Sequence, residues 1–86
     1  MAIPTNIKRE HIFQAMLKIN REGVPPRREP REWAVQYEEK LYPCKLLISY
    51  ANLYANGIEL DPDPRIFTTY RAQDYLQTLG FAVIEI

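Results

Sequence analysis

Several residue types that build common functional sites are scarce in this chain. It has one cysteine, Cys44, and one histidine, His11, so it can form neither an internal disulfide nor the cysteine and histidine clusters that bind structural zinc. None of its three glycines belongs to a glycine-rich phosphate-binding motif. No hydrophobic run approaches the roughly 18–20 residues that span a membrane. We therefore predict no metal, no cofactor and no membrane association.

The remaining residues do not assemble into a catalytic set. A Cys–His pair would require Cys44 and His11 to meet in space, and a cysteine at the start of an apolar segment is more commonly a packing residue. Asp61 and Asp63 are separated by a proline and lack the further acidic and glycine positions of a calcium loop. The sequence therefore predicts a protein that is not an enzyme.

Length and composition predict one folded domain over residues 1–86. The composition is 47% hydrophobic and 26% charged, which is typical of a folded protein and not of a disordered tail. The first six residues show no basic-then-apolar signal pattern, so the expected compartment is the cytoplasm.

The net charge is zero, yet the charges are unevenly distributed. Eleven Lys and Arg balance eleven Asp and Glu, which argues against a chain that holds nucleic acid by bulk charge alone. Residues 1–50 contain nine basic and six acidic residues, whereas residues 51–86 contain two basic and five acidic ones. Two outcomes are open: one face meets phosphates, or folding interleaves the two halves and cancels the field.

Three segments have the pattern of helices. The apolar residues of 7–21 recur at helical spacing, with Thr5 or Asn6 as the expected N-cap. The second segment runs from Pro43 to residue 56 and is apolar nearly all round, which predicts a buried helix at the centre of the fold. The third covers residues 69–79. Each is followed by a glycine that can end it, namely Gly23, Gly57 and Gly80.

The strands are predicted at residues 33–37, 40–42 and 81–86. In the first and last of these, larger side chains such as Trp33, Val35 and Tyr37, or Phe81 and Val83, recur at every second position. Residues 38–39 are Glu-Glu and lack the Gly or Asn of tight hairpins, so we expect a longer or bulged loop there. The order α-β-β-α-α-β predicts an α+β domain. Its sheet would be small and three-stranded, formed by a β-hairpin and the C-terminal strand.

A basic, proline-rich segment, residues 25–31, lies between the first helix and the hairpin. Guanidinium groups match phosphate geometry, and prolines hold the backbone extended, which lowers the ordering cost of binding. Because arginines are costly to bury unpaired, Arg27 and Arg28 are expected to project from the domain. The predicted nucleic-acid-binding residues are Arg27, Arg28, Arg31, Lys40 and Lys45.

Aromatic residues follow this segment closely in the sequence. Trp33, Tyr37 and Tyr42 have rings on which bases can stack. The alternative is that Trp33 belongs to the core and that Glu29 and Glu32 pair with the arginines.

Several short motifs together resemble a known module. They are Gly23-Val24-Pro25-Pro26-Arg27-Arg28, then Tyr37 to Tyr42-Pro43-Cys44-Lys45 before an apolar helix, Gly57 with Leu60-Asp61-Pro62, and Leu76 with Leu79-Gly80-Phe81. Over residues 7–86 the chain resembles the N-terminal head domain of ScoMcrA-like, modification-dependent HNH restriction endonucleases. It departs from that family at Glu38-Glu39, Cys44 and Thr68-Thr69, where a Gly-bearing turn, a second proline and a Gly pair are usual. Separate domains of those enzymes read modified DNA and cut it, so the resemblance implies DNA association or protein docking, and not cleavage.

Two functions follow as expectations. The leading one is a non-catalytic, DNA-associated recognition or accessory module of a restriction or defence system. Its expected partners are DNA, modified DNA included, and a nuclease or other restriction-system protein. The alternative is a protein–protein interaction or self-association module, such as a homodimer, that docks through the C-terminal strand edge and a set of tyrosines. These tyrosines are Tyr50, Tyr54, Tyr70 and Tyr75.

Overall fold

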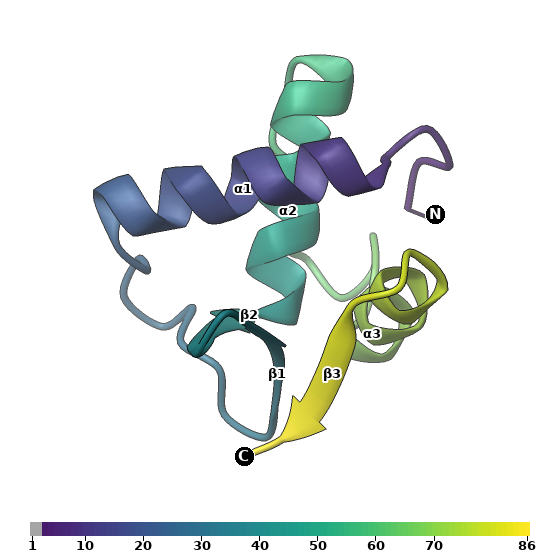
Figure 1. Cartoon of the computed structure of the whole chain (residues 1–86). Coiled ribbons are helices and arrows are strands. Elements are labelled where there is room, and N and C mark those ends of the chain that lie inside the picture. Colours follow the sequence, from purple (N-terminus) through teal and green to yellow (C-terminus); the bar gives the residue numbers. More distant parts are fainter. Residues whose placement is uncertain (1–2) are drawn as a thin grey trace.

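The computed structural model describes residues 3–86, which form three helices and one antiparallel sheet (Figure 1). The elements in chain order are α1 (Arg9–Glu22), β1 (Trp33–Tyr37), β2 (Lys40–Pro43), α2 (Cys44–Asn56), α3 (Thr69–Thr78) and β3 (Ala82–Glu85). This order and the α+β class confirm the prediction from the sequence. No helix within the described residues is long and apolar enough to cross a membrane.

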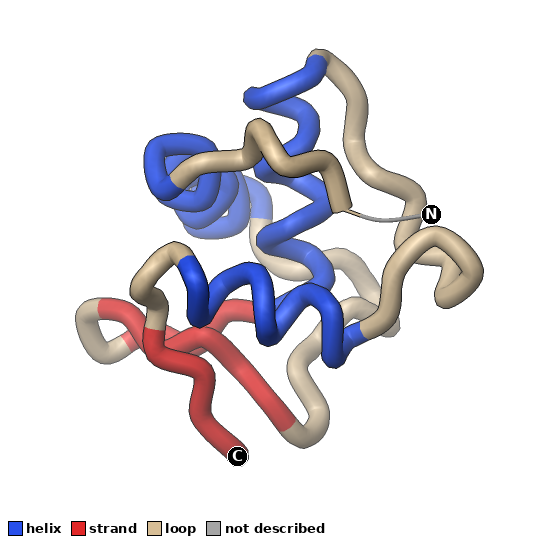
Figure 2. The backbone as a smooth tube through the Cα atoms, turned by 90° about the vertical axis from the view of Figure 1, so that its right-hand side faces the viewer, coloured by secondary structure: helices blue, strands red, loops and turns tan. Residues whose placement is uncertain are grey.

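The sheet has the strand order β2-β1-β3, so the first strand of the hairpin is central and the C-terminal strand is an edge. Val35 pairs with Tyr42 on one side and with Val83 on the other, both in antiparallel register. Figure 2 shows the three strands gathered on one side of the molecule, with the helices packed over them.

Helix α2 is the centre of the core, as its nearly uniform apolarity predicted. Leu46, Leu47 and Ile48 are fully buried within it. Helix α1 crosses α2 (Figure 1) and turns its apolar face inward, where Ile12 is fully buried and Met16 nearly so. Each such side chain stabilises the fold by about 1.5–3 kcal/mol relative to an exposed one.

The start of α1 differs from the prediction. The helix begins at Arg9 with Lys8 as its N-cap, so Thr5 and Asn6 as caps were wrong. The Asn6 amide instead exchanges two hydrogen bonds with the Asn56 side chain at the far end of α2. The Asn6 side chain, which the local pattern predicted as a helix cap, is thus held by a residue 50 positions away in the sequence.

The hairpin also differs from the prediction. Tyr37 pairs with Lys40, so the loop has only two residues and the expected longer or bulged loop was wrong. Glu38 and Glu39 have φ values of 48° and 68°, the left-handed conformation of a tight hairpin turn. Burial of Val35 and Tyr42 fixes this register, and it imposes on two glutamates a backbone that Asn and Gly adopt more readily.

The remaining boundaries shift by one or two residues. Pro43 ends β2 and is the N-cap of α2, so it is not the first helical residue. Helix α3 ends at Thr78. Strand β3 begins at Ala82, so Phe81 precedes it, and the Phe81 side chain is buried in the core. The three glycines end their helices as predicted, each with φ between 80° and 90°.

Candidate nucleic-acid interface

A hollow of about 400 Å³ opens where residues 25–31, here called the arginine loop, pass the N-terminal ends of α2 and α3. We call this cavity the basic hollow. Its lining combines residues 27–32 with Trp33 at the start of β1, residues 43–46 at the start of α2, and three residues of α3. The α3 residues are Thr69, Tyr70 and Gln73.

Four of the five predicted binding residues meet in this hollow. Arg27, Arg28 and Arg31 come from the loop, and Lys45 comes from the first turn of α2. Glu29 and Glu32 also line it, so the six charged side chains leave an excess of two positive charges. The fifth residue, Lys40, lies on β2 and lines a different, smaller hollow beside α1.

The arginines of the loop have no acidic partner. Ion pairs within 4.0 Å among residues 3–86 join Lys18 to Glu22, Arg21 to Glu22, and Arg65 to Asp63. None involves the arginine loop, so the alternative in which Glu29 and Glu32 pair with these arginines is not realised. Within the described residues, no carboxylate neutralises the arginines of the loop.

The two arginines of the Arg-Arg pair differ in exposure. Arg27 is exposed as predicted, whereas Arg28 is half-buried and its Nη2 donates to Oγ of the buried Ser49 at 3.4 Å. The expectation that both project from the domain was therefore wrong for Arg28. It lies against α2, because the long aliphatic part of arginine can cover apolar surface while the guanidinium finds a polar acceptor.

Lys45 lies in an unfavourable environment for a cation. Burial, and then the charge of Arg28, lower the pKa of its ammonium group below the ordinary 10.5, and Asp63 and Asp61 offset this only in part. Its Nζ donates to the carbonyl of Pro62 and lies 4.6 Å from the centre of the Phe67 ring. Arg28 and Lys45 are thus neighbouring cations at the start of α2, and neither forms an ion pair within the described residues.

The backbone of the arginine loop is strained at one point. The amide of Arg28 donates to the carbonyl of Pro25 at 3.1 Å, which closes a four-residue turn. Arg27, the third residue of that turn, has a φ of 67°, where glycine is preferred. A non-glycine residue there costs about 1–3 kcal/mol.

Aromatic and amide groups complete the lining. Trp33 is half-buried and Tyr70 is 73% exposed. The Nε2 atom of Gln73 is buried and has no hydrogen-bond partner among the described residues. An unpaired buried donor of this kind costs about 1–3 kcal/mol.

Only part of this grouping follows from the sequence. Trp33 is predicted as a stacking residue and Tyr70 as a protein-docking residue, whereas Gln73 is not singled out. Tyr37 and Tyr42 lie elsewhere, since Tyr37 packs against Phe13 and the hydroxyl of buried Tyr42 donates to Asn20. No spacing along the chain links Trp33 to α3, so no sequence signal would have found this grouping.

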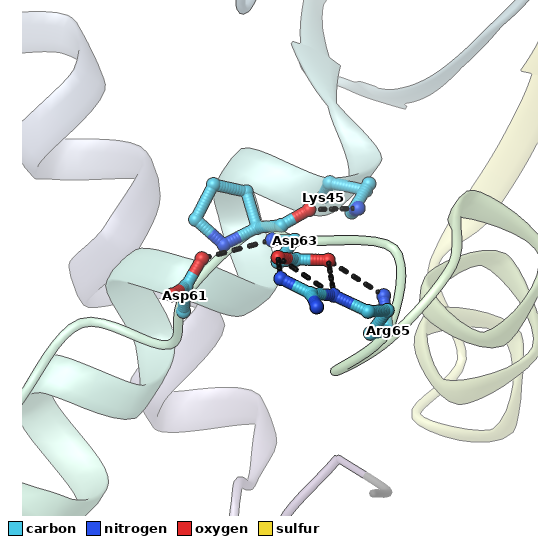
Figure 3. A network of polar contacts seen from close by, with 5 residues as sticks. Lys45, Asp61, Asp63 and Arg65 are labelled. Carbon is cyan, nitrogen blue, oxygen red and sulfur yellow. Dashed lines mark hydrogen bonds and ion pairs between the residues drawn. The ribbon is translucent and has the colours of Figure 1, made fainter.

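A second proline-containing segment, residues 61–65, lies next to Lys45 and is here called the aspartate loop (Figure 3). The Asp61 carboxylate accepts from the amide of Asp63, and the Asp63 carboxylate accepts from the Arg65 guanidinium at 2.8 Å. The hydrogen bonds from Arg65 lower the pKa of Asp63. Within the described residues, no group of three His, Cys, Asp or Glu side chains could hold a metal ion.

Cys44 and His11 are both occupied in ways that do not activate a nucleophile. Burial raises the pKa of the Cys44 thiol to about 11, so it is protonated at neutral pH. Nδ1 of His11 accepts from the amide of Lys8 at 2.9 Å. The absence of catalysis stays a prediction from the sequence.

Comparisons of the chain with protein-family models, with curated proteins and with solved structures find no match. The resemblance to the ScoMcrA-like head domain therefore stays a prediction from its motifs.

Proposed function

We propose that this protein is a non-catalytic module that binds nucleic acid, with DNA as the expected form, through phosphates held in the basic hollow. The observation that carries the proposal is the gathering of four cations around one hollow without an ion pair between the arginine loop and any acidic side chain of residues 3–86. Guanidinium groups bind phosphate oxygens in a bidentate way, which carboxylate-paired arginines cannot do.

The electrostatics of the α2 start support the same ligand. Burial, and then the charge of Arg28, lower the pKa of Lys45, and a bound phosphate would offset the repulsion between these two cations. Pro43, the N-cap of α2, supplies no side-chain acceptor to the first turn, which lines the hollow. The positive end of the helix dipole adds to the attraction for an anion.

The partners follow from the motifs. On the resemblance to the restriction-enzyme head domain, the module acts beside a nuclease or another restriction-system protein, on DNA that includes modified DNA. The free Cys44 thiol suits a reducing compartment such as the cytoplasm.

Salt dependence tests the proposal. A labelled duplex is titrated with the protein at several salt concentrations. About four phosphate contacts predict a slope of log K against log salt near −4. Arg27→Ala with Arg28→Ala should weaken binding and flatten that slope by about two. The matched control, Arg21→Ala with Arg71→Ala, removes two exposed arginines outside the hollow and should leave the contacts intact.

Folding must be checked because Arg28 contacts Ser49. Arg28→Lys keeps the charge without the bidentate guanidinium and should retain only part of the binding that Arg28→Ala loses. If the double alanine variant is folded and binds DNA like the parent, the proposal is wrong.

The alternative, a protein–protein or self-association module, has one observation in its favour. Strand β3 is an edge, and its pairing with β1 directs the backbone groups of Val83 and Glu85 away from the sheet. The predicted docking tyrosines support this alternative less, because Tyr50 is buried and the hydroxyl of Tyr75 donates to the Ile7 carbonyl. Sedimentation of the protein distinguishes the two functions, since a homodimer would persist at salt concentrations that release DNA.

A further inference from the structure

We infer that the basic hollow takes a single unpaired nucleotide, with its phosphate against the cations and its base on the aromatic rings. The inference rests on the proposed function and adds the form of nucleic acid that is bound. It predicts a preference for single-stranded DNA, or for a base that is extruded from a duplex, over an intact duplex.

The aromatic residues are the first reason. A site for backbone phosphates alone needs only cations and hydrogen-bond donors, but Trp33 and Tyr70 line this hollow as well. Tyr70 is 73% exposed, so the core does not use its ring. Neither ring stacks on another aromatic within the described residues, where the ring pairs involve only Phe13, Tyr37 and Phe81. The exposed ring of Tyr70 and the half-buried ring of Trp33 are thus not used in aromatic pairs, and base stacking on such rings tolerates any base.

The amide of Gln73 is the second reason. Its Nε2 is a buried donor without a partner among residues 3–86, and Gln73 lines the same hollow as the two rings. Phosphate oxygens and the edges of nucleobases both carry acceptors for such a donor. Because Nε2 is buried, the Gln73 side chain must turn into the hollow to reach such an acceptor. The edge of the base is the acceptor that the four cations do not serve.

The size of the hollow is the third reason. Its volume of about 400 Å³ is near the lower end of the roughly 300–1,000 Å³ of small-molecule pockets. It can admit one nucleotide, but a base pair in a stacked duplex cannot enter it. A base must therefore leave the stack, or come from a single strand, to reach Trp33.

The single tryptophan makes the test direct, because its intrinsic fluorescence reports only on the hollow. The probes are an oligothymidylate, a duplex of matched length, and that duplex with one unpaired thymidine. We expect the single strand and the unpaired site to quench Trp33 and to bind more tightly than the intact duplex. Tyr70→Ala should lower the affinity for the single strand about tenfold and leave duplex binding unchanged.

Two further variants sharpen the result. Tyr70→Phe keeps the stacking face and should bind like the parent, which separates loss of the ring from loss of the hydroxyl. Gln73→Leu keeps the shape without the donor and should weaken single-strand binding by a smaller factor than Tyr70→Ala.

Each outcome bears on a different claim. If single strand and duplex bind alike and Tyr70→Ala alters neither, the nucleotide site is wrong, while a steep salt slope would still support phosphate binding. Binding of the single strand without a change in Trp33 fluorescence also overturns the inference. If neither probe binds, the proposed function itself fails.

Discussion

The arginine loop and the aspartate loop are both short, charged and rich in proline, yet only the aspartate loop contains partners for its charged side chains. In the aspartate loop each carboxylate has a partner within two residues, and Arg65 is bound to Asp63 by several hydrogen bonds (Figure 3). Glu29 in the arginine loop and Glu32 directly after it lie beside the arginines without forming an ion pair. The aspartate loop thus supplies partners for its own carboxylates, whereas the arginine loop leaves its cations without an ion-pair partner among the described residues.

The difference teaches that opposite charges near one another in sequence need not pair. The short side chain of aspartate accepts from the backbone amide two residues on, as Asp61 and Asp63 both do. That local bond holds the Asp63 carboxylate where Arg65 can reach it. Glutamate is one carbon longer and lacks this local acceptor geometry, so Glu29 and Glu32 remain exposed and unpaired.

Lys45 links the two loops, since it lines the basic hollow and donates to Pro62 in the aspartate loop. The aspartate loop thus acts as a support that places one cation of the hollow. Four changes test this division between a supporting loop and a binding loop.

The largest effect is expected where the aspartate loop is anchored. Phe67 follows the loop, is buried, and lies beneath the Lys45 ammonium group. Phe67→Ala should lower the free energy of unfolding by about 3–5 kcal/mol through loss of burial and creation of a cavity. Urea denaturation measures this loss. Phe67→Leu, which keeps most of the volume, should cost less than about 1.5 kcal/mol. A small loss for the alanine variant would mean that this loop does not support the fold.

The next effect concerns the strained turn of the arginine loop. Arg27→Gly should be more stable than Arg27→Ala by about 1 kcal/mol, because glycine adopts the positive φ of residue 27 without strain. The two variants should bind DNA equally weakly, since both lack the guanidinium. Chemical denaturation and DNA titration of the same pair separate backbone strain from charge. Equal stability of the two would show that residue 27 carries no strain.

A smaller effect should follow from removing the unpaired acids. Glu29→Gln with Glu32→Gln should raise the affinity for DNA about three- to tenfold at low salt, because two repulsive charges leave the hollow. Glu38→Gln with Glu39→Gln, at the hairpin turn, makes the same change in net charge outside the hollow and should have a weaker effect. Equal gains from both variants would attribute the effect to net charge alone.

The smallest effect is a pH dependence that comes from Lys45. Its pKa is lowered in the folded protein, so the unfolded chain binds the proton more tightly. The contribution of Lys45 to stability should therefore rise as pH increases toward its ordinary pKa of 10.5. The pKa of Tyr75 is raised, so the contribution of Tyr75 to stability falls with increasing pH. The difference in urea midpoint between the parent and Lys45→Met cancels the Tyr75 contribution and leaves that of Lys45. An unchanged difference across that range would contradict the prediction.

Local sequence determined the elements and their order. The nearly unbroken apolar run of α2 predicted a central helix, and the glycines at 23, 57 and 80 end their helices at positive φ. These features depend on periodicity and backbone freedom, which act over a few residues and can be seen in a sequence.

Contacts between distant residues decided the details that the sequence did not reveal. The Asn6 side chain bonds to Asn56 and does not cap the helix. The pairing of Val35 with Tyr42 leaves only Glu38 and Glu39 for the turn, which is therefore tight. In both places the tertiary contact outweighs a local preference that is worth about 1 kcal/mol.

The candidate site shows the same division. The sequence by itself determined that an exposed basic segment stands before the hairpin, because arginines and prolines resist burial and regular structure. Only the tertiary structure decided that Lys45 joins this segment and Lys40 does not, and that Tyr70 and Gln73 complete the hollow. The reason is geometric: these groups stand on separate elements, and only the packing of α3 and the sheet around α2 brings their side chains to one cavity.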